Sequence, residues 1–163
     1  LKLTQAVTSG CHYLDLHKLM HRQLAGVLVE HSLLTCDAEE AFEQGLTEPF
    51  CPHGLGHLLG IQVHDVGGHQ INLKGEQAPP PASYSTLRLT RPLETNMVLT
   101  IEPGLYFIPS LLEPLRQAKA AINWSKIDAF MPFGGIRIED NVCVTQALPR
   151  NLTRDAFALA AKA

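Results

Sequence analysis

The stretch Pro52-His53-Gly54-Leu55-Gly56-His57-Leu58-Leu59-Gly60-Ile61-Gln62-Val63-His64-Asp65-Val66-Gly67-Gly68 decides how this chain is interpreted. Three histidines, His53, His57 and His64, stand in it at spacings of four and seven, among five glycines and several apolar residues. The glycines disfavour a helix, because each costs roughly 1 kcal/mol relative to alanine in a helix interior. We therefore expect a strand with tight turns, which Gly67-Gly68 closes.

The histidines of this stretch point to chemistry. Imidazole is the commonest transition-metal ligand and the usual proton carrier near neutral pH. The alternative is a set of partly buried histidines whose ring nitrogens are satisfied by backbone carbonyls. The spacing is not that of the His-Glu-x-x-His metalloproteases, because Gly54 stands where their glutamate would be.

Two expected strands carry carboxylates downstream. The apolar run Val98-Leu99-Thr100-Ile101 leads into Glu102 and ends at Pro103-Gly104, a turn. The segment 136–144 alternates apolar and polar residues, so Arg137 and Glu139 share one face of a strand, while Ile136 and Ile138 are expected to face a core. The alternative for Arg137 and Glu139 is a simple ion pair on a solvated face.

One imidazole and two carboxylates, carried on three strands, suit a hard or borderline divalent ion such as Mn²⁺ or Co²⁺. A structural zinc site would prefer thiolates, and the four cysteines are scattered with no Cys-x-x-Cys pair. A bridging carboxylate could hold two such ions close together.

The remaining pattern is that of one mixed domain. Apolar residues at helical spacing predict a helix over residues 14–34, and Asp37 with Glu40 predicts the start of a second helix. Short helices are expected within 111–130, and the Ala-rich tail after Asn151 is expected to be a terminal helix or a frayed end. A Pro-rich loop is expected over 74–84.

Composition narrows the class of protein. The 163 residues carry 13 Lys+Arg and 16 Asp+Glu, a balance that does not suggest nucleic acid or an anionic membrane as partner. An aromatic content of 6% argues against a base-stacking surface. No apolar run approaches the length of a membrane span and no signal peptide is visible, so we expect a cytoplasmic protein with reduced cysteines.

Taken together, these segments resemble the C-terminal part of the pita-bread metallopeptidases, closest to their proline dipeptidase (prolidase) branch. The resemblance rests on three stretches in the family's order and extends over nearly the whole chain. The stretches are His53–Gly68, Thr100-Ile-Glu-Pro-Gly-Leu-Tyr106 and Phe133-Gly-Gly-Ile-Arg-Ile-Glu-Asp140. It implies an α+β fold, a curved antiparallel sheet with helices packed on its outer face.

The resemblance also implies metal ligands and an activity. His57, Glu102 and Glu139 match metal ligands, with Glu139 bridging two ions and Glu102 also serving in proton transfer. The implied ions are two divalent metals, with Mn²⁺ first and Co²⁺ or Zn²⁺ as alternatives. The implied reaction is hydrolysis of Xaa-Pro dipeptides through a hydroxide activated by the dinuclear metal site.

Further roles follow from the same resemblance. His64 matches a catalytic histidine that contacts the substrate carbonyl. His53 matches a histidine counted with the catalytic residues, which lies either behind the metal ligands or on the substrate side of the site. Arg88 and Arg137 match substrate-binding arginines, with Arg88 the better candidate for the substrate carboxylate. Asp65 is expected to orient a neighbouring histidine rather than to bind metal.

This sequence lacks two of the metal ligands that the family uses. The family also uses two aspartates from an upstream strand hairpin, which nothing before residue 53 resembles, and Asp15 and Asp37 are expected to be helix caps. Because the chain begins with Leu1 rather than Met, we interpret residues 1–163 as the C-terminal part of a catalytic domain, inactive alone. Its partners would then be the rest of that domain and, in the full protein, a second copy in a homodimer.

Two other functions remain open. The same fold carries aminopeptidase P and organophosphorus acid hydrolase activities, and the residues seen here barely discriminate among them. A metal-free binding module is the non-enzymatic alternative, although His57, Glu102 and Glu139 are all present.

Overall fold

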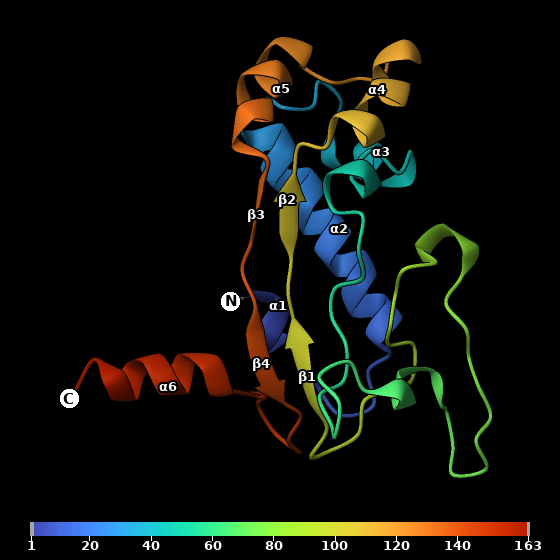
Figure 1. Cartoon of the computed structure of the whole chain (residues 1–163), viewed down its shortest axis with the longest axis vertical. Coiled ribbons are helices and arrows are strands. Elements are labelled where there is room, and N and C mark those ends of the chain that lie inside the picture. The colour runs from blue at the N-terminus through green and yellow to red at the C-terminus, as the bar shows by residue number, and fades with distance from the viewer. Residues whose placement is uncertain (1, 163) are drawn as a thin grey trace. The chain divides into compact units, whose positions relative to one another are not determined.

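The computed structural model describes residues 2–162 of the chain and has a mixed helix and antiparallel-sheet architecture (Figure 1). The helices are α1 Lys2–Gln5, α2 Tyr13–Glu30, α3 Ala38–Glu43, α4 Pro109–Gln117, α5 Trp124–Phe130 and α6 Leu152–Ala160. Short 3₁₀ turns occupy Glu48–Phe50, Val66–His69, Ala82–Tyr84 and Met131–Phe133. The strands are β1 Val98–Ile101, β2 Gly104–Tyr106, β3 Gly135–Arg137, β4 Asp140–Cys143 and β5 Arg150–Asn151.

The chain divides into two compact units. The first unit contains the residues up to Lys18, His53–Pro103 and Ile138 onward. The second contains Leu19–Pro52 and Gly104–Arg137.

The first unit is built on an antiparallel sheet with strand order β1-β4-β5. Val98 lies opposite Cys143, and Ile101 lies opposite Asp140, so β1 and β4 run side by side (Figure 1). Leu99 and Val142 are fully buried. Burial alternates along β4, as in a half-buried strand, whereas Leu99, Thr100 and Ile101 of β1 are all buried.

The second unit pairs β2 with β3 antiparallel, Gly104 opposite Arg137 (Figure 1). Its apolar core combines side chains from α2, α3, α4, α5 and the connecting segments. Aromatic rings contribute, with Phe107 stacked on Phe130 at 5.2 Å between ring centroids and edge-on to Phe50 at 6.1 Å.

Most of the expected helices are present. The helix predicted over 14–34 is α2, which ends at Glu30, and Ser32 adopts a left-handed backbone with φ of 55° just beyond it. Asp37 caps α3 by accepting a hydrogen bond from the Glu40 backbone N–H at 2.8 Å, which confirms its predicted role. The two short helices within 111–130 are α4 and α5, and the tail forms α6.

The strand predicted over 136–144 is wrong in two respects. The segment forms two strands, β3 and β4. Pro103 lies across from Ile138 and accepts a hydrogen bond from the Ile138 N–H at 3.2 Å. Because proline has no N–H to donate in return, the ladder is interrupted there. The alternation predicts that Ile136 and Ile138 face a core, but they are 63% and 56% exposed. Burial alternates along β4 but not along β3, whose three residues are all exposed. Alternation in the sequence therefore does not say whether either face of a strand is covered.

The histidine-rich segment forms less regular structure than expected. Its longest regular element is the 3₁₀ turn Val66–His69, and only Leu58 makes an isolated β-bridge, to Leu99. The glycines nevertheless act as the sequence indicated, since no α-helix forms there.

Two further expectations concern the thiols and the membrane. All four cysteines lie within the described residues and none forms a disulfide, in agreement with the prediction of reduced thiols. Among residues 2–162, no helix combines the length and the apolar character needed to cross a bilayer.

Candidate metal centre

His57 reaches the centre on a segment that runs antiparallel beside β1. Three backbone hydrogen bonds hold this segment: Leu59 N–H to Val98 C=O at 2.9 Å, Thr100 N–H to His57 C=O at 2.9 Å, and Glu102 N–H to Leu55 C=O at 2.8 Å. These bonds place the imidazole of His57 next to the carboxylate of Glu102, although the residues are 45 apart in sequence.

Glu102 and Glu139 are brought together by the register of the sheet. Because Ile101 lies opposite Asp140, the next pair along the two chains is Glu102 and Glu139. Two like charges directly opposite one another are destabilising in a sheet. The register therefore concentrates negative charge at one point, which a bound cation would offset.

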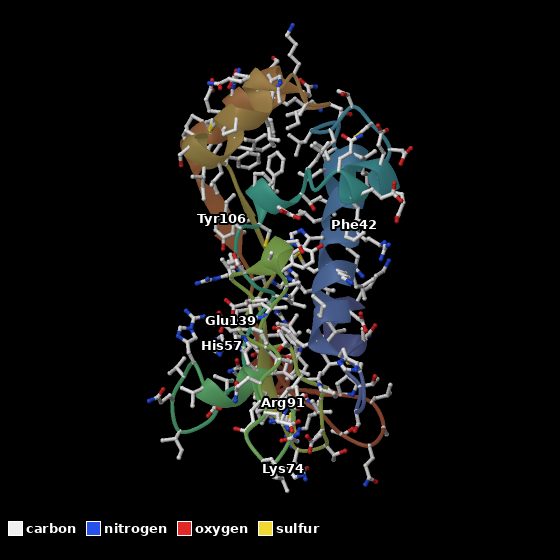
Figure 2. All side chains as sticks on the ribbon, turned by 90° about the vertical axis from the view of Figure 1, so that its right-hand side faces the viewer. Phe42, His57, Lys74, Arg91, Tyr106 and Glu139 are labelled. Atoms are coloured by element: carbon white, nitrogen blue, oxygen red, sulfur yellow. The ribbon has the colours of Figure 1, made fainter. Side chains whose placement is uncertain are left out.

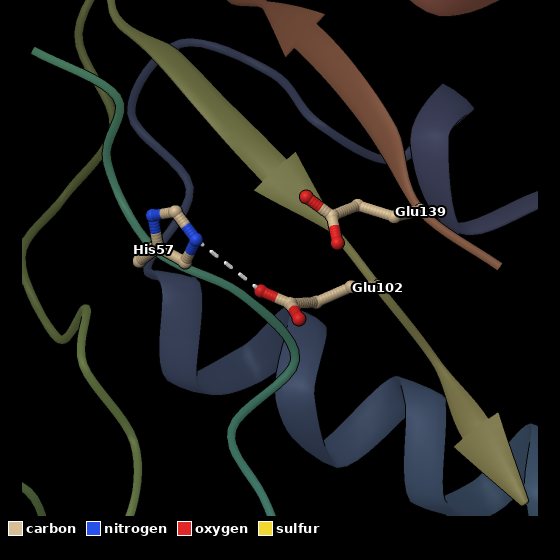
Figure 3. A group of neighbouring side chains, drawn as sticks. All are labelled: His57, Glu102 and Glu139. Atoms are coloured by element: carbon tan, nitrogen blue, oxygen red, sulfur yellow. Dashed lines mark ion pairs between the residues drawn. The ribbon is translucent and has the colours of Figure 1, made fainter. Parts of the chain in front are cut away.

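Among the described residues, the side chains of His57, Glu102 and Glu139 are close enough together to hold a metal ion. One ligand atom from each of His57, Glu102 and Glu139 lies within 4.8 Å of the others. Figure 3 shows the Glu139 carboxylate lying beside that of Glu102, with the His57 ring on the other side of Glu102. His57 and Glu139 also lie next to one another in the view of all side chains (Figure 2).

Local contacts orient the His57 ring as a ligand. Its Nδ1 lies 2.9 Å from the Leu58 carbonyl, which can only accept, so Nδ1 carries the proton. Nε2 then presents its lone pair toward the Glu102 carboxylate, whose Oε1 is 3.5 Å away. A hydrogen bond of this kind on the other nitrogen is the usual way in which proteins orient a metal-binding histidine.

The composition of the group suits a divalent ion. His57 and Glu102 are buried, at 4% and 8% exposure, and Glu139 is exposed. A buried carboxylate without a compensating cation is costly, and nitrogen with two carboxylates is a borderline-to-hard donor set. The residues present therefore fit a divalent metal, as the sequence indicated.

Two aspartates considered in the sequence do not join this group. Asp37 caps α3, and Asp15 lies in the first turn of α2. Within the described part of the chain, the group of three has no fourth carboxylate, thiolate or imidazole at the same mutual distances.

The two other histidines of the predicted site, His53 and His64, lie in the first unit with His57. The His64 ring is exposed and lies edge-on to that of His57, with centroids 4.3 Å apart. His53 is half-buried, and its Nδ1 lies 2.8 Å from the Gly54 carbonyl. The alternative interpretation, histidines satisfied by backbone carbonyls, is therefore correct for one nitrogen each of His53 and His57.

The two predicted substrate-binding arginines are exposed, and Asp65 does not have its predicted role. Arg88 is exposed on the first unit, and Arg137 is exposed at the end of β3 in the second unit. The sequence predicts that Asp65 orients a histidine, but its carboxylate caps the 3₁₀ turn by accepting from Gly67 N–H at 2.8 Å. The reason is local: an aspartate two residues before a glycine readily forms such a turn.

Sequence reasoning missed two side chains that support the group, Thr100 and Tyr13. Thr100 Oγ1 contacts both His57 and Glu102, and the Tyr13 hydroxyl donates to the Thr100 carbonyl at 2.8 Å. The position of Thr100, two residues before Glu102 on the same strand face, was the available signal. Nothing in the sequence pattern singles out Tyr13, which is 87 residues from Thr100.

Comparison with known proteins places this geometry in a family. Residues 1–146 match the metallopeptidase family M24. The Xaa-Pro dipeptidase of Pectobacterium carotovorum is 50% identical over 158 residues, and that of Yersinia pestis strain Pestoides F is 51% identical over 158 residues. Each comparison covers 95% of this chain and 36% of the relative, so the chain spans little more than a third of these proteins.

Solved structures agree on the fold. Zinc-substituted aminopeptidase P of Escherichia coli, in complex with product, superposes with a TM-score of 0.64 at 30% identity, covering 94% of this chain and 28% of that one. Proline aminopeptidase P II of Yersinia pestis gives 0.62 at 30% identity over 98% and 32%. The chain has part of the pita-bread fold of these enzymes, and it belongs to metallopeptidase family M24.

Proposed function

We propose that this chain is part of a metal-dependent peptidase that hydrolyses Xaa-Pro dipeptides. The observation that supports this most directly is the convergence of His57, Glu102 and Glu139 within 4.8 Å. The substrate class comes from similarity, because relatives about 50% identical over nearly the whole chain are named Xaa-Pro dipeptidase.

The cofactor in this proposal is a pair of divalent ions, with Mn²⁺ first and Co²⁺ or Zn²⁺ as alternatives. His57 and Glu102 would each contribute to one ion and Glu139 would contribute to both. The remaining ligands, two aspartates, would come from upstream chain. When bound, such ions act as Lewis acids and make water a competent nucleophile at neutral pH.

The side chains of this chain would then handle protons and substrate. The nitrogen of an imide bond carries no hydrogen, so it must gain a proton before proline leaves. Glu102, beside the reacting centre, would carry that proton. His64 would donate to the carbonyl oxygen as negative charge develops on it.

The substrate's own charge would be met by arginine. A dipeptide ends in a carboxylate, and a guanidinium binds it through two parallel charge-assisted hydrogen bonds. Arg88 is the proposed partner of that carboxylate. Arg137 and His53 are proposed to line the substrate side of the site.

The partner expected from the sequence is the rest of the catalytic domain, and the second unit has a surface that suits such a partner. An open apolar cavity of about 770 Å³ is lined by Val27, Leu105, Phe130, Phe133 and Ile136, among others. Phe133 is 78% exposed there. Large exposed apolar patches usually mark interaction sites. A homodimer of the full protein and a cytoplasmic location remain predictions from the sequence.

The principal alternative is aminopeptidase P activity, which the solved structures at 30% identity carry in their names. The dipeptidase relatives are more similar in sequence, at 50% and 51% identity, and this favours the dipeptidase. Organophosphorus acid hydrolysis is a further possibility for the same site. A metal-free binding module is disfavoured because the ligand group His57, Glu102 and Glu139 is intact.

The test is proline release from Xaa-Pro dipeptides by the full protein loaded with Mn²⁺. We expect turnover of Gly-Pro but little of Gly-Pro-Gly, and we expect this chain alone to be inactive. Loss of an outer contact to a ligand costs roughly 10–100-fold, so Glu139→Gln, which alters a ligand, should lower kcat/KM by at least about 100-fold. Glu43→Gln, the same change at an exposed position on α3, is the control.

The outcomes separate the candidate functions. No proline release by the metal-loaded full protein would overturn the proposal, and faster cleavage of Gly-Pro-Gly would replace it with aminopeptidase P. Full-rate turnover by this chain alone would show that the ligand set lies within residues 1–163.

A further inference from the structure

The side chain of Thr100 lies behind the candidate ligands rather than among them. Thr100 is in β1 and is fully buried. It precedes Glu102 by two residues, so both side chains project from the same face of the strand. Leu99 and Ile101, on the opposite face, are buried apolar residues.

One hydroxyl links the two buried ligands. Thr100 Oγ1 accepts a hydrogen bond from the His57 backbone N–H at 2.9 Å and donates its own hydrogen to Glu102 Oε1 at 3.0 Å. The His57 carbonyl, at 3.4 Å, is a more distant alternative acceptor. The hydrogen goes to Glu102, because the carboxylate oxygen, at 3.0 Å, is nearer than the carbonyl oxygen, at 3.4 Å.

The backbone beneath this hydroxyl is itself held. The Tyr13 hydroxyl donates to the Thr100 carbonyl at 2.8 Å from a fully buried position. Burial, with the nearby charge of Glu102 and of Cys11, raises the pKa of Tyr13 well above its usual value, so the phenol stays a donor. Thr100 therefore has little freedom to move relative to either ligand.

We propose that Thr100 is a positioning residue of the metal centre: its hydroxyl sets the separation of His57 and Glu102 before an ion binds. This inference rests on the proposed function, in which these two residues are ligands. Preorganisation of this kind matters because a metal site loosened by a fraction of an ångström binds its ion less well.

The alternative is that Thr100 merely satisfies buried hydrogen bonds and contributes to stability alone. The chain offers a matched control. Thr47 is also buried, at 1% exposure, and its hydroxyl shares a hydrogen bond of 2.9 Å with His21 Nδ1, which is not a candidate ligand. Thr47→Val and Thr100→Val thus each remove one hydroxyl from a buried threonine.

The experiment titrates this chain with Zn²⁺ and follows the ring nitrogens of His57 by ¹⁵N NMR, a method that reaches millimolar dissociation constants. Thr100→Val should weaken binding at His57 by roughly 10–100-fold, as loss of an outer contact to a ligand does. Thr100→Ser retains the hydroxyl and should restore most of the affinity. Thr47→Val should lower thermal stability without changing the Zn²⁺ affinity.

A second readout uses the full protein. There, Thr100→Val should raise the Mn²⁺ concentration needed for half-maximal activity and leave the KM for Gly-Pro, measured at saturating Mn²⁺, nearly unchanged. This split is not expected from a loss of stability alone.

The results distinguish two failures. If Zn²⁺ leaves the His57 signals of the wild-type chain unmoved, the ligand assignment is overturned, and the role of Thr100 with it. If the wild type binds Zn²⁺ but Thr100→Val binds it equally well, or loses no more than Thr47→Val does, only the positioning role is overturned.

Discussion

At the scale of single residues, Gly56 shows why a glycine precedes the candidate ligand His57. A Cβ at this position would meet the Thr100 carbonyl and hydroxyl and the Tyr13 hydroxyl at distances that real Cβ atoms essentially never show. The missing side chain lets the His57 segment approach β1 closely enough for the backbone hydrogen bonds between them. The sequence identified Gly56 only as a residue that disfavours a helix.

Gly56→Ala should therefore destabilise the chain by about 1–3 kcal/mol, the usual cost of overpacking, and weaken metal binding by displacing His57 or Thr100. The measurement is the free energy of unfolding in urea. Gly26→Ala is the control, because a Cβ at that position on α2 would meet no atom within 4 Å other than its chain neighbours and the backbone of its own helix. That change should stabilise the chain by up to about 1 kcal/mol; equal effects of the two substitutions would contradict the role given to Gly56.

At the scale of elements, the start of α6 holds the start of β4, immediately after Glu139. Asp140 is buried at 5% exposure, and its carboxylate accepts from Asn151 Nδ2 at 3.0 Å and pairs with Arg154 Nη2 at 2.8 Å. Thr153 Oγ1 accepts from the backbone N–H of Asn141 at 2.8 Å. The exposed candidate ligand Glu139 is thus followed by an anchored strand.

Arg154→Ala should lower the free energy of unfolding by about 1–3 kcal/mol, because a buried charged acceptor loses its cationic partner. Arg150→Ala removes an ion pair between two exposed side chains, Arg150 and Asp155 of α6, which are 2.9 Å apart. This change should lower the free energy of unfolding by no more than about 1 kcal/mol. Urea denaturation of the two variants checks this. If Arg150→Ala proved the more damaging, Asp140 would not be the anchor.

Elements were the level at which the sequence was most informative. Apolar spacing located α2, and Asp37 correctly marked the start of α3. The failure at 136–144 has a physical cause in a distant segment, since Pro103, between β1 and β2, interrupts the ladder across from Ile138. No property of residues 136–144 themselves could reveal that interruption.

At the scale of the whole molecule, apolar surface is left exposed in the second unit. Phe133 and Ile136, which line its cavity, are 78% and 63% exposed. Scattered exposed apolar residues are normal, whereas a contiguous patch promotes association. This chain by itself is therefore expected to self-associate.

Replacing the two residues together, Phe133→Asn with Ile136→Thr, should shift the chain toward monomer in sedimentation velocity. The control pair, Leu73→Asn with Leu148→Thr, removes side chains that are 103% and 81% exposed and lie outside this cavity. It should leave the distribution unchanged. Equal dispersal by both pairs would mean that general surface hydrophobicity, and not this cavity, drives association.

The sequence by itself singled out the candidate residues: His57 within its glycine-rich segment, Glu102 at the end of an apolar strand, and Glu139 in the alternating segment 136–144. These signals are local, because backbone propensity and side-chain alternation depend on near neighbours. Only the tertiary structure decided that the three meet within 4.8 Å, that Thr100 and Tyr13 support them, and that Ile136 and Ile138 are exposed. Strand register and burial depend on contacts between segments far apart in the chain, and a local pattern does not contain them.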